Sequence, residues 1–158
     1  MITVALKVGD EYYLPTLHFA RTETHGPGPV NTWHCHDVFH VVYVVEGSGF
    51  FRIGDREADA RPGLLFFIGP KVWHQFIALT DPFRYDALTF DLAAEDGSQC
   101  DRPFWEIFSR ADRRWIRSVL REGVLEVPEP LRPQVRALFA DATAAWSRGL
   151  GPGAPAGL

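Results

Sequence analysis

Residues 33–47, with the sequence WHCHDVFHVVYVVEG, constrain the fold of this chain more than any other stretch. The run is rich in Val and aromatic residues, which is typical of a β-strand, and His34, His36 and His40 all stand at even positions. Side chains alternate between the two faces of a strand, so the three imidazoles are predicted to point to one interior. A single histidine there is usually a hydrogen-bonded core residue, but three together are costly unless a partner shares their lone pairs. A metal ion does so, and the stretch therefore predicts a metal site.

Residues 1–95 are predicted to form a succession of short strands. Apolar runs alternate with turn signals rich in Gly, Pro and Asp, which gives roughly eight or nine strands at spacings of about 8 to 12 residues. The turn signals stand at residues 9–10, 22–32, 46–49, 54–55, 62–63, 69–70 and 80–82. This pattern indicates a β-sandwich or a small β-barrel.

Residues 96–150 are predicted to be helical. A polar linker leads to Pro103, which suits the first turn of a helix, and Gly123 is a plausible stop. Apolar residues then recur at steps of three and four, the spacing of an amphipathic helix. The first stripe is Phe104, Phe108, Ala111, Trp115 and Val119, and the second is Leu131, Val135, Leu138, Ala142 and Trp146. We therefore expect a pair of C-terminal helices, followed by a flexible tail at 151–158.

Charge and cysteine content exclude several classes of protein. The formal net charge of −4 gives no reason to expect direct contact with nucleic acid or an anionic membrane. Cys35 and Cys100 lie far apart, so neither a disulfide framework nor a redox motif is indicated. The first residues lack a secretory signal, and no window reaches the length of a transmembrane helix. We expect a single cytoplasmic domain.

A second stretch, GLLFFIGPKVWH at residues 63–74, completes a resemblance to a known family. The spacing HxHxxxHx₆G at residues 34–47 resembles the first motif of the cupin superfamily, and residues 63–74 resemble the second. The resemblance implies a small antiparallel barrel, the double-stranded β-helix. Its first motif supplies two His and usually a Glu, and its second motif another His, all to one metal ion.

Carried over by position, the resemblance makes His34, His36 and His74 metal ligands and puts His40 at the position of the Glu. The implied site therefore has four histidines. Gly69 and Lys71 replace the usual Pro and Gly, which predicts a differently shaped loop before the last ligand. The two remaining histidines, His18 and His25, are assigned to surface or packing roles.

A narrower resemblance links the chain to the N-terminal effector-binding domain of AraC-type transcription regulators. It rests on the segments HDVFHVVYVVEGSGF, RPGLLFFIGP, HQF and YDALTF. In that family a cupin barrel is followed by helices that mediate dimerisation, and then by a DNA-binding part with two helix-turn-helix units. The resemblance implies that residues 96–150 dimerise and that the DNA-binding part is absent from this chain.

The favoured hypothesis is a sensor domain that binds a small effector inside the barrel and forms a homodimer. Imidazole ligands suit a divalent transition metal, with zinc or nickel favoured for a sensor. The candidate effector-pocket residues are Trp33, Tyr43, Arg52, Phe66 and Trp73, although aromatic residues in a small barrel are mostly core.

Two other hypotheses stay open at this stage. One is a stand-alone cupin enzyme, an oxygenase or isomerase with iron or manganese, for which Tyr43 and Glu46 are the nearest acid–base candidates. The other is a metal-free cupin whose histidines hydrogen-bond a polar effector such as a sugar. The identity of the bound metal distinguishes among the three.

Overall fold

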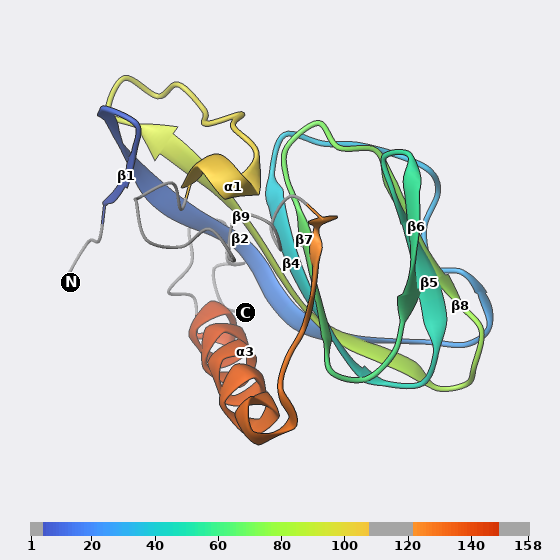
Figure 1. The fold of residues 1–158 in the computed structure, drawn as a ribbon. Helices are drawn as coiled ribbons and strands as arrows, with labels where there is room; N and C mark the ends of the chain where they lie inside the picture. The colour runs from blue at the N-terminus through green and yellow to red at the C-terminus, as the bar shows by residue number, and fades with distance from the viewer. Residues whose placement is uncertain (1–4, 108–121, 149–158) are drawn as a thin grey trace.

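The computed structural model describes residues 5–107 and 122–148 of the 158-residue chain. Two antiparallel sheets curl against each other (Figure 1), and the prediction of a mainly β chain with a barrel is confirmed. One sheet has the strand order β1-β2-β9-β4-β7-β10, and the other has the order β3-β8-β5-β6. The strands are β1 (Leu6–Val8), β2 (Glu11–His25), β3 (Gly28–Pro29), β4 (Phe39–Glu46), β5 (Gly49–Ile53), β6 (Arg56–Ala60), β7 (Leu64–Ile68), β8 (His74–Ala78), β9 (Phe83–Ala94) and β10 (Val124–Glu126).

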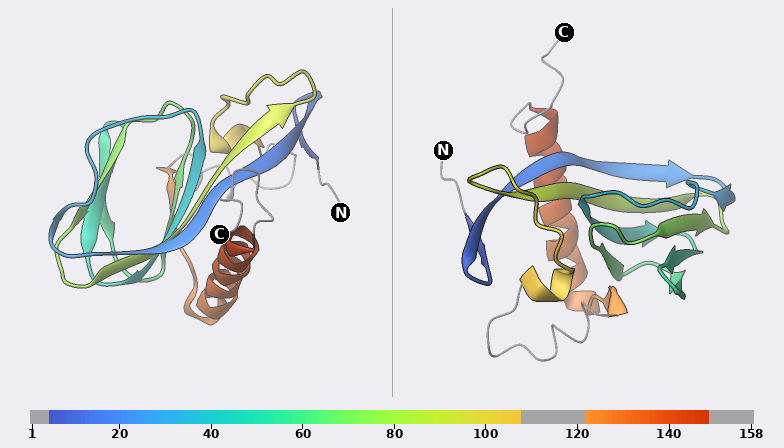
Figure 2. Two further views of the ribbon diagram at one scale, coloured as in Figure 1. Left: turned by 180° about the vertical axis from the view of Figure 1, so that it is seen from behind. Right: turned by 90° about the horizontal axis from the view of Figure 1, so that it is seen from above.

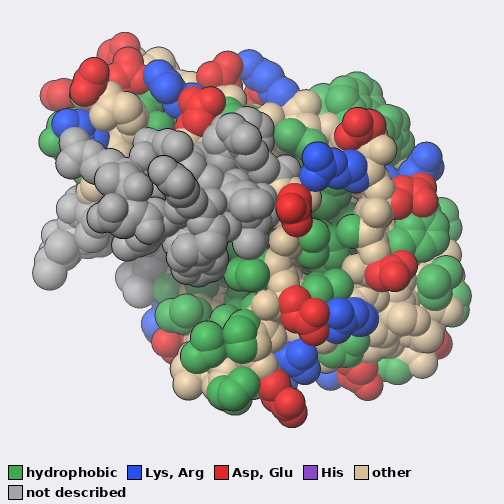
Figure 3. Space-filling model, in the orientation of Figure 1, with side chains coloured by type: hydrophobic (Ala, Val, Ile, Leu, Met, Phe, Trp, Pro, Cys, Tyr) green, Lys and Arg blue, Asp and Glu red, His purple; other side chains and the backbone are tan. Residues whose placement is uncertain are grey.

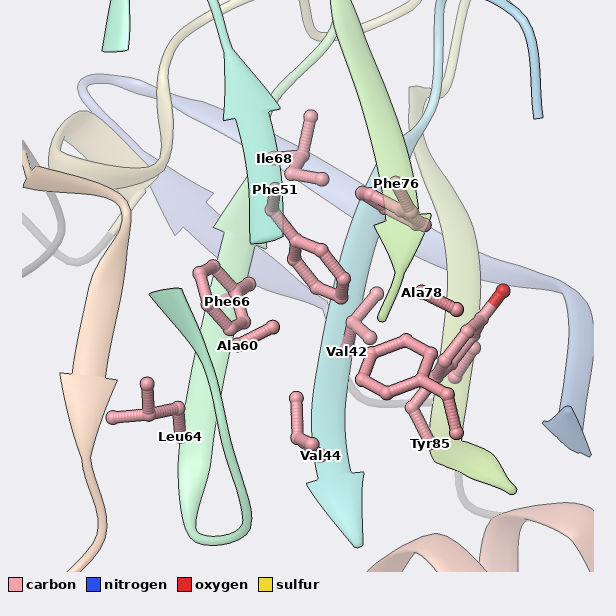
Figure 4. Packing of buried hydrophobic residues seen from close by; sticks show 12 residues of the cluster. Val42, Val44, Phe51, Ala60, Leu64, Phe66, Ile68, Phe76, Ala78 and Tyr85 are labelled. Atoms are coloured by element: carbon pink, nitrogen blue, oxygen red, sulfur yellow. The ribbon is translucent and has the colours of Figure 1, made fainter. Parts of the chain in front are cut away.

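Aromatic side chains from both sheets fill the barrel (Figure 4). The Phe51 ring lies at its centre, with ring centroids 4.3 Å from Phe66 and 4.1 Å from Phe76. All three are at least 95% buried. Burial of such rings is the largest favourable contribution that a barrel of this size obtains, because each removes a large apolar area from water.

Strand β7 is apolar at every position because both of its faces are covered. Leu64, Phe66 and Ile68 point into the barrel core, whereas Phe67 packs outside against Phe104 at 5.5 Å between ring centroids. Phe104 begins α1 (Phe104–Ile107), a single turn. A strand covered on both faces shows a continuous apolar run, as residues 64–68 do.

The C-terminal part returns to the barrel. Strand β10 pairs antiparallel with β7, and the 3₁₀ turn η1 (Glu129–Leu131) leads into α3 (Arg132–Ser147). Helix α3 lies against the outer face of β2 and β9, and Figure 2 shows this from two further sides. The cavity described below lies on the inner face of the same strands.

The predicted pair of C-terminal helices is found only in part. The described residues contain one long C-terminal helix, α3, together with the short turn α1. Residues 108–121, which carry most of the first predicted stripe, lie outside the described residues. Within the described ranges, no helix is both long and apolar enough to span a membrane.

Candidate functional site

The histidines of the first motif do not share one strand, contrary to the simple reading of their spacing. Only His40 lies in β4. His34 forms an isolated backbone bridge with His74, and His36 lies in the segment between His34 and β4. In the bridge, His34 N–H donates to the His74 carbonyl at 3.2 Å and His74 N–H donates to the His34 carbonyl at 2.8 Å. This backbone pairing, and not strand alternation alone, brings the two motifs together.

The loop before His74 contains a residue with a left-handed backbone conformation. Lys71 has φ +62°, the left-handed conformation that favours glycine, at the position where the resemblance expects one. Its backbone N–H donates to the carbonyl of His36 at 2.7 Å. Lys71 thus has a backbone conformation that suits the glycine expected there, and its hydrogen bond ties this loop to His36.

Four histidines converge at one end of the barrel. His34, His36 and His74 each offer a ring nitrogen, and these three atoms lie within 4.8 Å of one another. His40 joins through His36, because the Nε2 atoms of the two rings contact each other. In every pair of these rings other than His34 and His40, the centroids are 4.2 to 5.5 Å apart. No Asp or Glu among residues 5–107 and 122–148 belongs to this histidine group.

Hydrogen bonds at the far side of the rings set the tautomers. Nδ1–H of His34 donates to the Thr32 carbonyl at 2.7 Å, and Nδ1–H of His74 donates to the Val72 carbonyl at 2.8 Å. A carbonyl oxygen only accepts, so the proton resides on Nδ1 and each Nε2 keeps its lone pair. Nδ1 of His40 bonds Oγ1 of Thr89 at 2.6 Å. Such partners orient metal-binding imidazoles in proteins.

Burial favours the neutral form of three histidines in the cluster, His36, His40 and His74. Burial, followed by the neighbouring histidines, lowers the pKa of His40 to about 3. Burial also lowers the pKa of His74 to about 4, and burial and the adjacent His34 lower the pKa of His36. Metal ligation requires neutral imidazole, so these rings are ready to bind at neutral pH without releasing protons.

These observations show that the residues fit a divalent transition metal. The ring nitrogens converge, the pKa values of His36, His40 and His74 are lowered, and the hydrogen bonds of His34 and His74 leave their Nε2 lone pairs available. His36 also has a buried Nδ1 with no hydrogen-bond partner. Neutral nitrogen donors suit zinc, nickel, copper or iron(II), and the donor set alone does not select among them.

A cavity of about 380 Å³ opens beside the histidines. Besides the four clustered histidines, its wall contains apolar and polar side chains. The apolar part consists of Phe19, Val30, Val42, Phe76 and Ala87, and the polar part of Arg21, Glu23, His25, Asn31 and Tyr85. This size is near the lower end of the range for small-molecule sites, roughly 300 to 1,000 Å³.

The polar part of the wall is internally paired. The Arg21 guanidinium contacts the Glu23 carboxylate, and it also lies 4.7 Å from the centroid of the Phe19 ring. The ring of His25 stacks on Tyr85 at 5.7 Å, and its Nε2 lies 3.5 Å from the Tyr85 hydroxyl. Burial raises the pKa of Tyr85, so the hydroxyl stays protonated and available as a donor.

The family model for the AraC-like ligand-binding domain matches residues 16–148, which is most of the chain. The chain belongs to this family. The AraC-like ligand-binding domain has a cupin-type fold, as the two motifs imply. A comparison with curated proteins found no match.

Solved cupin structures are similar to this AraC-like domain at low sequence identity. Oxalate decarboxylase from Bacillus subtilis is 16% identical, with a TM-score of 0.43, over 84% of this chain and 42% of its own. KdgF from Halomonas sp. is 20% identical, with a TM-score of 0.41, over 54% and 86% of the two chains. A cupin 2 conserved barrel domain protein from Rhodopseudomonas palustris is 22% identical, with a TM-score of 0.42, over 60% and 80%. The chain thus spans about two fifths of the length of the oxalate decarboxylase.

The structure places none of the five predicted effector-pocket residues on the cavity wall of this AraC-like domain. Trp33 and Trp73 stack on each other outside, 41% and 49% exposed, and Arg52 lies 5.6 Å from the Trp33 ring. Phe66 belongs to the barrel core and Tyr43 faces α3. Because His34 and His74 point inward, their sequence neighbours Trp33 and Trp73 point outward.

The acid–base candidates of the enzyme hypothesis lie away from the cavity. Tyr43 is on the outer face of β4, and the exposed Glu46 pairs with Arg84 at 3.2 Å. Four of the residues that do line the cavity come from β2, which the sequence interpretation did not assign to the site. Their signal is a period of two, Phe19-x-Arg21-x-Glu23-x-His25, which places four side chains on one face.

Proposed function

We propose that this chain is the sensor domain of an AraC-type transcription regulator and binds a small effector through a metal ion. The ligands are His34, His36, His40 and His74, and the effector occupies the adjoining cavity. The observation that carries the proposal is that a cluster of four histidines lines a cavity of about 380 Å³. Membership of a ligand-binding family supports the small-molecule ligand.

Each element of the site has a distinct task in this proposal. The carbonyls of Thr32 and Val72 hold the rings of His34 and His74 in the ligating tautomer, and Thr89 orients His40. A bound zinc or nickel ion supplies a Lewis-acidic position for an oxygen or nitrogen of the effector. The apolar wall excludes water from that position, which strengthens polar contacts inside it.

The strands that line the cavity also carry the helix. Along β2, Arg21 and Glu23 face the cavity, while Thr22 between them faces α3 and its Oγ1 donates to Asp86 at 2.6 Å. An effector that moves this strand changes the surface on which α3 rests. We infer that regulation results from different effector affinities for two arrangements of α3.

The same helix offers a surface for dimerisation. Leu131, the last residue of η1, and Leu138 of α3 are 51% and 69% exposed. Figure 3 shows hydrophobic side chains gathered over α3, and none of the described histidines is visible on this face. We place the homodimer contact there, and assign DNA binding to another part of the regulator.

Elemental analysis of untagged protein, purified without chelators or nickel resin, tests the proposal. We expect about one equivalent of zinc or nickel per chain in the wild type and in His18→Ala, a matched control for loss of a histidine. The double variant His34→Ala/His36→Ala should bind none. Stoichiometric metal in that variant contradicts the proposed site, whereas one equivalent of iron or manganese with oxygen uptake favours a metal-dependent oxygenase.

A further inference from the structure

We propose that the effector is a small monocarboxylate whose charged group completes the metal site, with a short apolar body against the barrel wall. This inference rests on the proposed function, because it concerns the ligand of the same metal site. It follows from the charge of the groups around the cavity and from their arrangement.

The donor set supplies no negative charge. All four proposed ligands are histidines, which ligate as neutral imidazoles. A divalent ion bound there keeps both of its positive charges, next to His74, which is 1% exposed, and the buried Phe76. An uncompensated charge in such surroundings is costly, and a bound cation is the largest local charge in its site. An anionic ligand is therefore favoured over a neutral one.

The charged side chains of the cavity wall do not offset the positive charge of the metal ion. Of the described residues that line the cavity, Arg21 is the only Lys or Arg, and Glu23 is the only carboxylate. The two side chains contact each other, so their charges cancel. One carboxylate at the metal reduces the excess charge, whereas a second carboxylate held along the wall, away from the metal, meets no unpaired cation. This favours a monocarboxylate over an extended dicarboxylate.

The lining and volume of the cavity limit the rest of the effector. The rings of Phe19 and Phe76 and the side chains of Val30 and Ala87 offer an apolar surface. A volume of about 380 Å³ leaves room for a small ring or a branched aliphatic group, but not for a long chain. The Tyr85 hydroxyl, which is buried beside His25, can donate a hydrogen bond to the effector.

Calorimetric titration with matched probes tests the inference. The probes are benzoate and its neutral amide benzamide, and isobutyrate and isobutyramide. We expect metal-loaded protein to bind at least one carboxylate about tenfold or more tighter than its amide, which is 1.4 kcal/mol or more, and metal-free protein to show no such preference. His40→Glu adds a carboxylate ligand and should reduce the preference to about threefold or less. Arg52→Gln, which removes a cation from the outer face, should leave it unchanged.

The outcomes separate this inference from the proposed function. Wild-type protein that binds no metal overturns both. Metal-loaded protein that binds both amides as tightly as the acids, or binds a pentose or inorganic phosphate more tightly, overturns the inference and leaves the metal site standing. If His40→Glu fails to hold metal, the wild-type comparison of acid and amide still decides the question.

Discussion

The Nε2 atoms of His36 and His40 contact each other at the wall of the cavity. His36 comes from a loop fixed by Lys71 and His40 from strand β4, so the contact joins the two parts of the first motif. Two lone pairs that face each other are unfavourable unless a proton or a cation lies between them. This contact therefore links metal binding to the protonation of the site and to the stability of the fold.

Thr89→Val should weaken metal binding without removing a ligand. Oγ1 of Thr89 bonds Nδ1 of His40, and loss of such a partner typically lowers metal affinity about 10- to 100-fold. The measurement is a competition titration with a metal-binding dye. Thr22→Val is the matched control, since its hydroxyl bonds Asp86 on the outer face. Equal affinity in the two variants would show that the Thr89 hydrogen bond does not support metal binding.

Metal-free protein should lose stability as the pH falls below about 6.5. The folded pKa values of His40 and His74, about 3 and 4, lie below the ordinary value of 6.5. Between these values the unfolded chain binds more protons than the folded chain, so acid favours unfolding, and the loss levels off near pH 3 to 4. From pH 7.5 to pH 5 we expect a loss of about 2 kcal/mol for each of the two histidines, less than additive because the rings interact.

Urea unfolding at a series of pH values in the presence of a chelator measures this loss. His40→Gln removes one of the two groups and should make the pH dependence clearly shallower. A free energy of unfolding that is constant from pH 7.5 to pH 5 would contradict the neutral, buried state of the cluster.

The sequence predicted the mainly β barrel because its signal is local. Alternating apolar runs and glycine-rich turns specify short strands without knowledge of their partners. The spacing of His34, His36 and His40, together with the resemblance, also selected the residues that converge. Strand alternation explains this convergence only in part, because only His40 lies in β4. His34 and His36 are positioned by backbone contacts with residues 71–74.

The cavity wall could not be predicted in the same way. The register of β2 against β9 shifts between Leu17 and Phe19, which makes His18 a bulge and sets Phe19, Arg21 and Glu23 toward the interior. The position of a bulge depends on the partner strand, so no local sequence pattern predicts it. Trp33 and Trp73 are sequence neighbours of the inward-facing His34 and His74, and in extended backbone consecutive side chains point to opposite sides.

Gly47→Ala should destabilise the fold strongly. Gly47 has φ +82°, and a Cβ there would overlap the Pro82 carbonyl oxygen and lie 2.6 Å from Oγ1 of Thr80. Strain and overlap together should cost about 3 kcal/mol or more in the free energy of unfolding. Gly97→Ala is the control, since φ is +84° and nothing lies within 4 Å of the added Cβ, so only about 1 to 2 kcal/mol is expected. Equal effects in thermal unfolding would contradict close packing at the β4–β5 turn.

Phe139→Ala should detach α3 from the sheet. Phe139 is the only residue of α3 that is buried, and its ring stacks on Tyr43 at 6.2 Å between centroids. Truncation of a buried Phe costs about 3 to 5 kcal/mol, most of which should appear as local release of the helix. Hydrogen exchange should therefore become faster in α3 while the barrel strands stay protected. Uniform acceleration over all strands would show that helix and barrel unfold as one unit.

Leu138→Glu should abolish the proposed dimer without unfolding the chain. Leu138 is next to Phe139 but points to solvent, and an exposed substitution usually changes stability by about 0.5 kcal/mol or less. A carboxylate at a twofold contact faces its own copy, so like charges and lost apolar contact both oppose association. Sedimentation equilibrium should give a monomer for this variant and a dimer for the wild type and for Leu79→Glu, an exposed leucine between β8 and β9. A Leu138→Glu dimer as tight as the wild type would exclude this face of α3 as the interface.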